Sequence, residues 1–207
     1  MKIVKVETIH SCGEYAKSKD WAEKRNAIHE AVKKCDWPPN SGTFTVNPTR
    51  KGNGVVPIKK EFIAELKRRA WTIEGKAVTK GGKDLGEFDA VVIGNEGTVV
   101  TEWETGNVSS SHRSMNKLTM LVKDKVISAG VLIVPARTLG RYLTDRIGNF
   151  ELLEVLCEEF GELRRLLVIC ALVRPRIARI QQLAWHARHR LRDRQAERLL
   201  DFVPALQ

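Results

Sequence analysis

Three carboxylates have the types and spacing for metal-assisted chemistry: Asp89, Glu102 and Glu104. They lie in two β-rich runs, residues 88–94 and 98–104, which are separated by turn-forming residues and therefore predict a β-hairpin. Side chains two apart in a strand share a face, so Glu102 and Glu104 should point the same way, about 7 Å apart. The hairpin brings Asp89 opposite the end of the second strand. We expect a cluster of three carboxylates.

This cluster suits hard divalent cations. Mg²⁺ binds carboxylate and phosphate oxygens, and two such ions about 4 Å apart stabilise both the attacking and the leaving oxygen of a phosphodiester displacement. The alternative is that the acids are solvated residues on the polar face of a strand. Three basic residues near the cluster in chain order favour the metal site, because a nuclease also needs a surface that attracts phosphate. They are Lys59, Arg113 and Lys117.

The composition is that of one globular domain with a polyanionic partner. Of the 207 residues, 43% are hydrophobic and 29% are charged, which excludes a disordered or repeat-built chain. The formal net charge of +10 favours nucleic acid over a membrane surface. The four scattered cysteines indicate reduced thiols rather than a zinc site or disulfides. No apolar run is long enough to span a bilayer, so we expect a cytoplasmic protein without a membrane segment.

Hydrophobic periodicity and chain breakers predict helices that alternate with strands. The fold class is therefore α/β, with a central mixed β-sheet flanked by helices. The expected helices cover residues 17–35, 57–70, 108–125 and 135–145, and one more begins at 149. Besides the hairpin, extended segments are expected at residues 43–46, 72–79 and 127–134.

The C-terminal part of the chain has a different composition. All seventeen lysines lie at or before Lys125, whereas the last fifty-seven residues hold ten arginines and one glycine. We expect a core over residues 1–160 and a divergent segment over 161–207, with a strand at 166–173 and then an Arg-rich helix. Two origins of this segment remain open: a native extension, or a shifted reading frame from about Glu151.

Three segments of the sequence carry a family resemblance. They are residues 54–59 (GVVPIK), 102–117 (EWETGNVSSSHRSMNK) and 142–151 (YLTDRIGNFE). In order and spacing they resemble the BamHI-type restriction endonucleases, over roughly Thr43 to Glu154. The later strands and the Gly-rich C-terminal arm of that family have no counterpart here. If those strands help to hold the sheet, either the strand at 166–173 replaces them or the chain is poorly stable.

The resemblance implies a Mg²⁺-dependent homodimer that cleaves both strands of double-stranded palindromic DNA at GGATCC. It implies a restriction-endonuclease-like PD-(D/E)xK core in which a glutamate replaces the usual lysine. A cognate DNA methyltransferase that protects the host's own sites would be the functional partner. The helix at 108–125 and the one from 149 would form the dimer interface, although packing within one chain explains their apolar positions equally well.

The resemblance also implies roles for five residues near the scissile phosphate. Asp89 and Glu102 would hold metal, and Glu104 would be both a metal ligand and the general base for the attacking water. Glu74 would be an auxiliary acid. Lys59 would contact phosphate next to the metals.

Five further residues would bind DNA through its bases: Asn107, Ser109, Arg113, Asp145 and Arg146. The chemistry agrees, because Arg forks onto guanine, Asp accepts from cytosine and Asn pairs with adenine. Simpler explanations exist: Asp145 and Arg146 would form an ion pair at a helix end, and Arg113 would lie on a solvated helix face.

An alternative function belongs to a different class. The chain would then be a catalytically impaired, DNA-binding remnant of such an enzyme. Its acidic cluster would survive, but its C-terminal part would no longer support catalysis.

Overall fold

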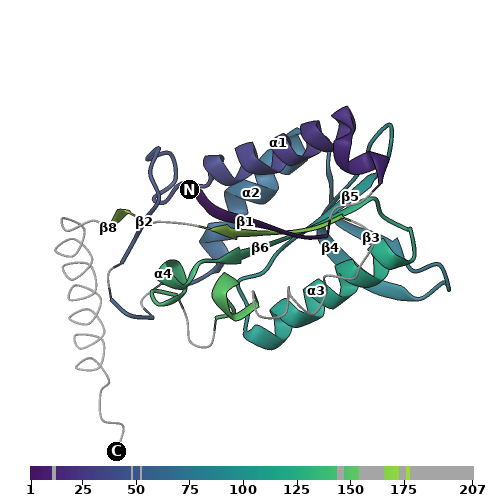
Figure 1. Ribbon diagram of the computed structural model, residues 1–207. Helices are drawn as coiled ribbons and strands as arrows, with labels where there is room; N and C mark the ends of the chain where they lie inside the picture. Colours follow the sequence, from purple (N-terminus) through teal and green to yellow (C-terminus); the bar gives the residue numbers. More distant parts are fainter. Residues whose placement is uncertain are drawn as a thin grey trace, which may run out of the picture.

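The computed structural model is a six-stranded sheet with helices on both faces (Figure 1). It describes residues 1–10, 13–47, 49–51, 53–143, 147–153, 166–172 and 176–177. The elements are β1 (Ile3–His10), the 3₁₀ helix η1 (Glu14–Lys17), α1 (Lys19–Lys34), β2 (Thr45–Val46), α2 (Val56–Arg68), β3 (Thr72–Val78), β4 (Asp84–Ile93), β5 (Thr98–Trp103), α3 (Val108–Lys123), β6 (Ala129–Pro135), α4 (Arg137–Gly140), β7 (Leu166–Leu172) and β8 (Arg176–Ile177). Within these ranges no helix is long and apolar enough to cross a membrane.

The sheet is mixed, which confirms the predicted α/β class. Its strand order is β1-β7-β6-β5-β4-β3. The strands β5, β6 and β7 are parallel to one another, whereas β3, β4 and β5 form an antiparallel meander and β1 runs antiparallel to β7. The short strands β2 and β8 form a separate parallel pair.

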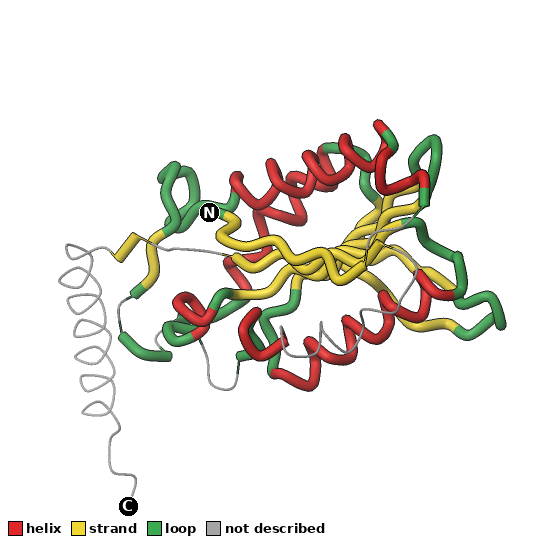
Figure 2. Tube along the Cα trace, in the orientation of Figure 1, coloured by secondary structure: helices red, strands yellow, loops and turns green. Residues whose placement is uncertain are grey.

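The two faces of the sheet carry separate hydrophobic cores. Helices α1 and α2 cover one face and α3 covers the other (Figure 2). On β5, Val99 belongs to the core under α1 and α2, while its neighbour Val100 belongs to the core under α3. The strand β6 is buried along its whole length, as expected for a parallel strand with neighbours on both sides and helices on both faces.

Helix α3 is fixed to the end of β5 by its first residues. Asn107 caps it, because the side-chain Oδ1 accepts the backbone N–H of Ser110 at 2.9 Å. The apolar residues that face the sheet recur at three- and four-residue steps, as the sequence predicts, and all are buried. They are Met115, Leu118, Leu121 and Val122. The buried face of α3 packs on the sheet and shares one hydrophobic core with Val91 of β4 and Val100 of β5.

Helix α2 is held against the same hairpin from the opposite face. Its residues Phe62 and Leu66 are fully buried, and the Phe62 ring centroid lies 4.8 Å from that of Trp103. Trp103 is itself buried, as strand alternation predicts. This contact places the first turn of α2, with Lys59, over the end of β5.

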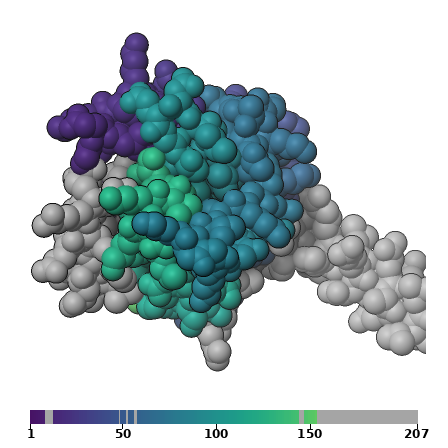
Figure 3. Space-filling view, turned by 90° about the vertical axis from the view of Figure 1, so that its right-hand side faces the viewer, coloured from purple at the N-terminus to yellow at the C-terminus, as the bar shows by residue number. Residues whose placement is uncertain are grey.

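The turn of the β4–β5 hairpin is anchored to the start of α1. Asp20 is buried and accepts the backbone N–H of Asn95 at 3.2 Å and the hydroxyl of Tyr15 at 3.0 Å. A Cβ at Gly94 would overlap the Asp20 carboxylate, so this position requires glycine. In Figure 3 the residues of this turn lie beside the N-terminal residues, which are drawn in purple.

The C-terminal part of the described chain joins the sheet. The strand predicted at 166–173 is present as β7, and it pairs with β6 on one side and with β1 on the other. The boundary predicted at residue 160, between the core and the divergent segment, would separate β7 from the sheet in which it pairs. The Arg-rich helix predicted after it lies outside the described residues.

Two sequence expectations differ from the structure. The helix expected over 135–145 is only the four-residue α4, which ends at Gly140, and glycine is a poor helix former. Strand β1 was not expected at all. Residues 3–8 do contain a β-rich run, but β1 gains its place only by pairing with β7, more than 150 residues away in sequence.

Candidate active site

The β4–β5 hairpin holds Asp89 and Glu102 side by side where its two strands stop pairing. The last paired residues are Ala90 and Thr101. One residue further, the N–H of Asp89 donates to Glu102 Oε2 at 3.2 Å, and the N–H of Trp103 donates to Asp89 Oδ2 at 2.7 Å. Each carboxylate therefore accepts a hydrogen bond that a backbone carbonyl would otherwise accept, and the sheet itself fixes both acids.

Two lysines, from helices on opposite faces of the sheet, pair with these carboxylates. Lys59 of α2 forms an ion pair with Asp89. Lys117 of α3 lies 3.5 Å from Glu102 Oε1 and also donates to the backbone carbonyl of Glu87 at 3.2 Å. The end of the hairpin thus combines two adjacent acids with two cations.

Burial makes Glu102 an unusual acid. Only 8% of the residue is exposed. The pKa of Glu102 is raised to about 7, mainly because burial removes water from the charged form and in addition because the Asp89 carboxylate is close. Lys117 and the N–H of Asp89 act in the opposite direction. A second positive charge at this position would stabilise the ionised form.

This raised pKa predicts that Glu102 destabilises the chain above neutral pH. The Glu102 carboxyl has a pKa of 4.5 in the unfolded chain and of about 7 in the folded chain, so between these pH values only the folded chain keeps the proton. This proton binding stabilises the fold at low pH, and the stabilisation is lost as the pH rises through 7. We expect Glu102→Gln, measured in EDTA by urea unfolding, to raise the free energy of unfolding at pH 8 by on the order of 1–3 kcal/mol. The substitution should change it little at pH 5. Equal effects of Glu102→Gln at the two pH values would contradict a raised pKa of Glu102.

Glu104 is the first residue after β5 and is held by α3. Its N–H donates to the carbonyl of Ile133 at 2.8 Å. Its carboxylate accepts the N–H of Gly106 at 2.7 Å and the hydroxyl of Ser114 at 3.2 Å. Glu102 and Glu104 therefore contact the same helix, through Lys117 and Ser114.

The predicted cluster of three carboxylates is not assembled, and this corrects the sequence-based expectation. Among the described residues no group of three Asp, Glu, His or Cys side chains lies close enough to hold one ion. Asp89 pairs with α2, on one face of the sheet, whereas Glu102 and Glu104 contact α3 on the other. Strand alternation correctly relates Glu102 to Glu104, but the divergence of β4 from β5 decides how Asp89 is oriented.

Glu74 lies on the next strand, β3, beside Asp89. The pairs Ile73–Ala90 and Gly75–Phe88 place it opposite Asp89 in the register. Its side chain is exposed, and its φ of 53° is in the left-handed region, which is uncommon for a residue other than glycine. The structure therefore places Glu74 on the strand next to Asp89 and opposite it in the register, and its role as an auxiliary acid stays a prediction.

Three of the predicted base-reading residues lie together at the N-terminal end of α3. Asn107 is the exposed N-cap, Ser109 is exposed in the first turn, and Arg113 is exposed one turn later. They share a helix with Ser114 and Lys117, which contact the acids.

The other two, Asp145 and Arg146, lie outside the described residues. The residues directly after them return to α3. Ile147 forms a β-bridge with Asn107, and the N–H of Gly148 donates to the carbonyl of Gly106 at 2.9 Å.

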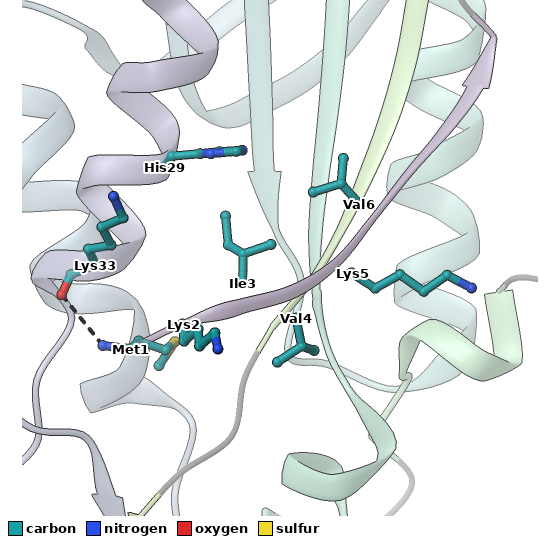
Figure 4. Close-up of a pocket in the computed structure, with 8 residues that line it drawn as sticks. All are labelled: Met1, Lys2, Ile3, Val4, Lys5, Val6, His29 and Lys33. Atoms are coloured by element: carbon teal, nitrogen blue, oxygen red, sulfur yellow. Dashed lines mark hydrogen bonds between the residues drawn. The ribbon is translucent and has the colours of Figure 1, made fainter.

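A separate cavity of about 380 Å³ lies between β1 and α1 (Figure 4). Its lining comes from the first two residues, from β1 and from His29 and Lys33, and none of these described lining residues is acidic. The Met1 amino group donates to the carbonyls of Lys33 at 3.5 Å and of Cys35 at 2.6 Å. Because the lining holds no carboxylate, this cavity does not have the chemistry predicted for the site.

A comparison with protein families decides what kind of protein this is. The model of the restriction endonuclease BamHI family matches residues 1–173. The chain belongs to the BamHI restriction endonuclease family. This match extends beyond the Thr43–Glu154 range of the resemblance at both ends, and it includes both β1 and β7.

Two curated proteins are similar to the chain. The type II restriction enzyme OkrAI of Oceanobacter kriegii is 45% identical over 129 residues, which are 62% of this chain and 66% of that protein. The type II restriction enzyme BamHI of Bacillus amyloliquefaciens is 39% identical over 137 residues, 62% of this chain and 64% of that protein. The chain thus spans slightly less than two thirds of the curated relatives it matches.

A solved structure supports the fold. The restriction endonuclease BglII, solved in complex with a DNA 16-mer, superposes with a TM-score of 0.58 at 10% identity, covering 83% of this chain and 79% of that one. The restriction-endonuclease-like core predicted from the sequence is confirmed.

Sequence reasoning missed Ser114, which contacts one of the candidate acids in this BamHI family member. Ser114 was not singled out, although it lies three residues before Lys117 and therefore shares its helix face. The signal was available in the helical spacing. The role of Ser114 could not be predicted, because only the fold shows that this helix face packs against Glu104.

Proposed function

We propose that this chain is a type II restriction endonuclease that cleaves both strands of palindromic DNA at GGATCC with Mg²⁺ as cofactor. The observation that carries the proposal is the pair of adjacent carboxylates, Asp89 and Glu102, flanked by Lys59 and Lys117. Membership of the BamHI family supports it, since both curated relatives are named type II restriction enzymes.

The residues present fit a magnesium ion. Mg²⁺ sites that act on phosphates use one or two protein carboxylates, and substrate oxygens and water complete the shell. Asp89 and Glu102 supply two such carboxylates. Because burial and the Asp89 charge raise the pKa of Glu102, a bound cation would stabilise its charged form. The chemistry that the ion would supply is charge stabilisation at the attacking and leaving oxygens.

The remaining residues bind, orient and move a proton. Lys59 would bind a phosphate oxygen next to Asp89, exchanging its ion pair for the DNA backbone. Glu104 would orient the attacking water and accept its proton at one carboxylate oxygen. Glu74 would add negative charge on the neighbouring strand.

Recognition would use the N-terminal end of α3 together with Asp145 and Arg146. Asn107, Ser109 and Arg113 are exposed there and have the donors and acceptors that base edges require. A palindrome is read by a two-fold symmetric homodimer with one subunit on each half-site. We propose that the enzyme acts in the cytoplasm beside a cognate DNA methyltransferase.

Digestion of plasmid DNA that contains GGATCC tests the function. With Mg²⁺ we expect discrete fragments cut at that site, and none in EDTA or with Glu104→Ala. If the folded chain binds the site but yields no fragments with any divalent ion, it is the DNA-binding remnant instead. Random fragmentation would contradict the proposed specificity.

Arg113→Ala is expected to relax recognition while leaving the fold intact. A lost bidentate contact to guanine costs about 1–3 kcal/mol, which is roughly a 5- to 150-fold loss of preference for GGATCC over a site changed at one base pair. Binding measured in EDTA gives this ratio. Lys123→Ala is the matched control, because it removes an exposed charge from the other end of α3. An equal loss of preference in both variants would contradict base reading by Arg113.

A further inference from the structure

Both oxygens of the Glu104 carboxylate are held by residues around the start of α3. Oε1 accepts the N–H of Gly106 at 2.7 Å, and Oε2 accepts the hydroxyl of Ser114 at 3.2 Å. A Cβ on Gly106 would lie 2.6 Å from Oε1, so only glycine lets the carboxylate approach this N–H. The direction of the carboxylate is therefore set by two donors rather than by strand geometry.

Ser114 lies on the buried face of the helix whose exposed residues would read bases. It is 6% exposed, whereas Ser109 and Arg113 on the same helix are exposed. One turn further, Lys117 contacts Glu102. Helix α3 therefore holds both glutamates from one face and presents DNA-binding groups on another.

The first turn of α3 is packed tightly against the residues that follow Arg146. Gly148 donates to the carbonyl of Gly106 at 2.9 Å, and a Cβ at Gly148 would overlap the hydroxyl of Ser111. A shift of this turn would move Gly106 and Ser114 together, and with them the carboxylate of Glu104.

We propose that Ser114 is a positioning residue that fixes the direction of the Glu104 carboxylate and ties it to the seating of α3. The inference rests on the proposed function, since Glu104 is there the group that accepts the proton of water. A base pair that seats α3 poorly would then slow cleavage through Glu104, and not only weaken binding.

Ser114→Ala separates this role from a structural one. We expect the single-turnover cleavage rate of GGATCC duplex with Mg²⁺ to fall about 10- to 100-fold, the usual cost of losing such a partner. The dissociation constant for the same duplex in EDTA should change less than about twofold, because Ser114 is buried and faces Glu104 rather than the exposed side of α3. The rate ratio between GGATCC and a site changed at one base pair should fall as well. Ser114→Thr, which keeps the hydroxyl, should restore most of the rate.

Thr119→Val is the matched control. Thr119 is also buried on α3, and within the described residues its hydroxyl has no hydrogen-bond partner. We expect the wild-type rate from this variant. A Ser114→Ala rate within twofold of wild type, or an equal loss in Thr119→Val, would overturn the inference.

A titration with Mn²⁺ keeps the inference separate from the proposed function. The water that Glu104 would orient lies beside the ion proposed on Asp89 and Glu102, so Glu104 is an outer partner of that ion. We therefore expect Ser114→Ala to weaken Mn²⁺ binding in the presence of cleavage-resistant phosphorothioate GGATCC duplex by about tenfold. If the unsubstituted chain cuts no DNA, the proposed function fails, and unchanged Mn²⁺ affinity in Ser114→Ala would then overturn the positioning role as well.

Discussion

Asp89→Asn is expected to abolish cleavage while leaving DNA binding intact. The amide oxygen can still accept the N–H of Trp103, so the end of the hairpin keeps its shape, but the negative charge that faces Lys59 is lost. A carboxylate that holds a catalytic ion contributes several kcal/mol to the transition state, and about 4 kcal/mol corresponds to roughly a 10³-fold loss of rate. Single-turnover digestion of GGATCC duplex measures this loss.

The control for this prediction is Asp84→Asn, the same change on the same strand. Asp84 is exposed, and its partners are Lys76 and the N–H of Gly86 rather than the site. We expect this variant to cleave at the wild-type rate. Affinity for the duplex in EDTA should stay the same or rise in Asp89→Asn, because a negative charge near phosphate has been removed. More than a tenth of wild-type activity in Asp89→Asn would remove Asp89 from the proposed centre.

Phe62→Ala is expected to have the largest effect on stability. The side chain is fully buried between α2 and the sheet, with its ring 4.8 Å from Trp103. Truncating a buried phenylalanine costs about 3–5 kcal/mol, because the cavity that remains is only partly refilled. For a chain of this size that corresponds to a fall in Tm of roughly 6–20 °C, which thermal unfolding by circular dichroism measures.

The neighbouring Ile63 provides the comparison for Phe62. It is only half-buried, so Ile63→Ala should cost clearly less than Phe62→Ala. Phe62→Ala should also lower activity at temperatures where the chain remains folded, because α2 carries Lys59 and Trp103 donates to Asp89. A loss of stability below about 1 kcal/mol would show that this contact does not hold α2 on the sheet.

Local patterns in the sequence predicted the elements that depend on neighbouring residues. The hairpin of β4 and β5 follows from two β-rich runs around a short turn, and α3 follows from a cap and apolar residues at helical spacing. The common direction of Glu102 and Glu104 follows from strand alternation. Both glutamates do contact α3. These features could be predicted because each of the rules acts over only a few residues.

Long-range pairing is where local patterns stop being informative. The sequence did not predict β1, and it predicted β7 only as a replacement for the later strands of the family. In the structure the two strands pair with each other at one side of the sheet. A strand of either sequence gains its stability from a partner far away in the chain, and the order of strands cannot be read from either one alone.

The sequence by itself predicted the family and the fold class, and both are confirmed. It also singled out the acidic residues, whose role in the site stays a prediction. Only the tertiary structure decided that Lys59 and Lys117 approach the two adjacent acids from opposite faces, and that Ser114 and Gly106 hold Glu104. The physical reason is that the divergence of β4 from β5, together with the helices packed on each face, sets the direction of these side chains. Those contacts join residues up to thirty positions apart, which no strand or helix period relates.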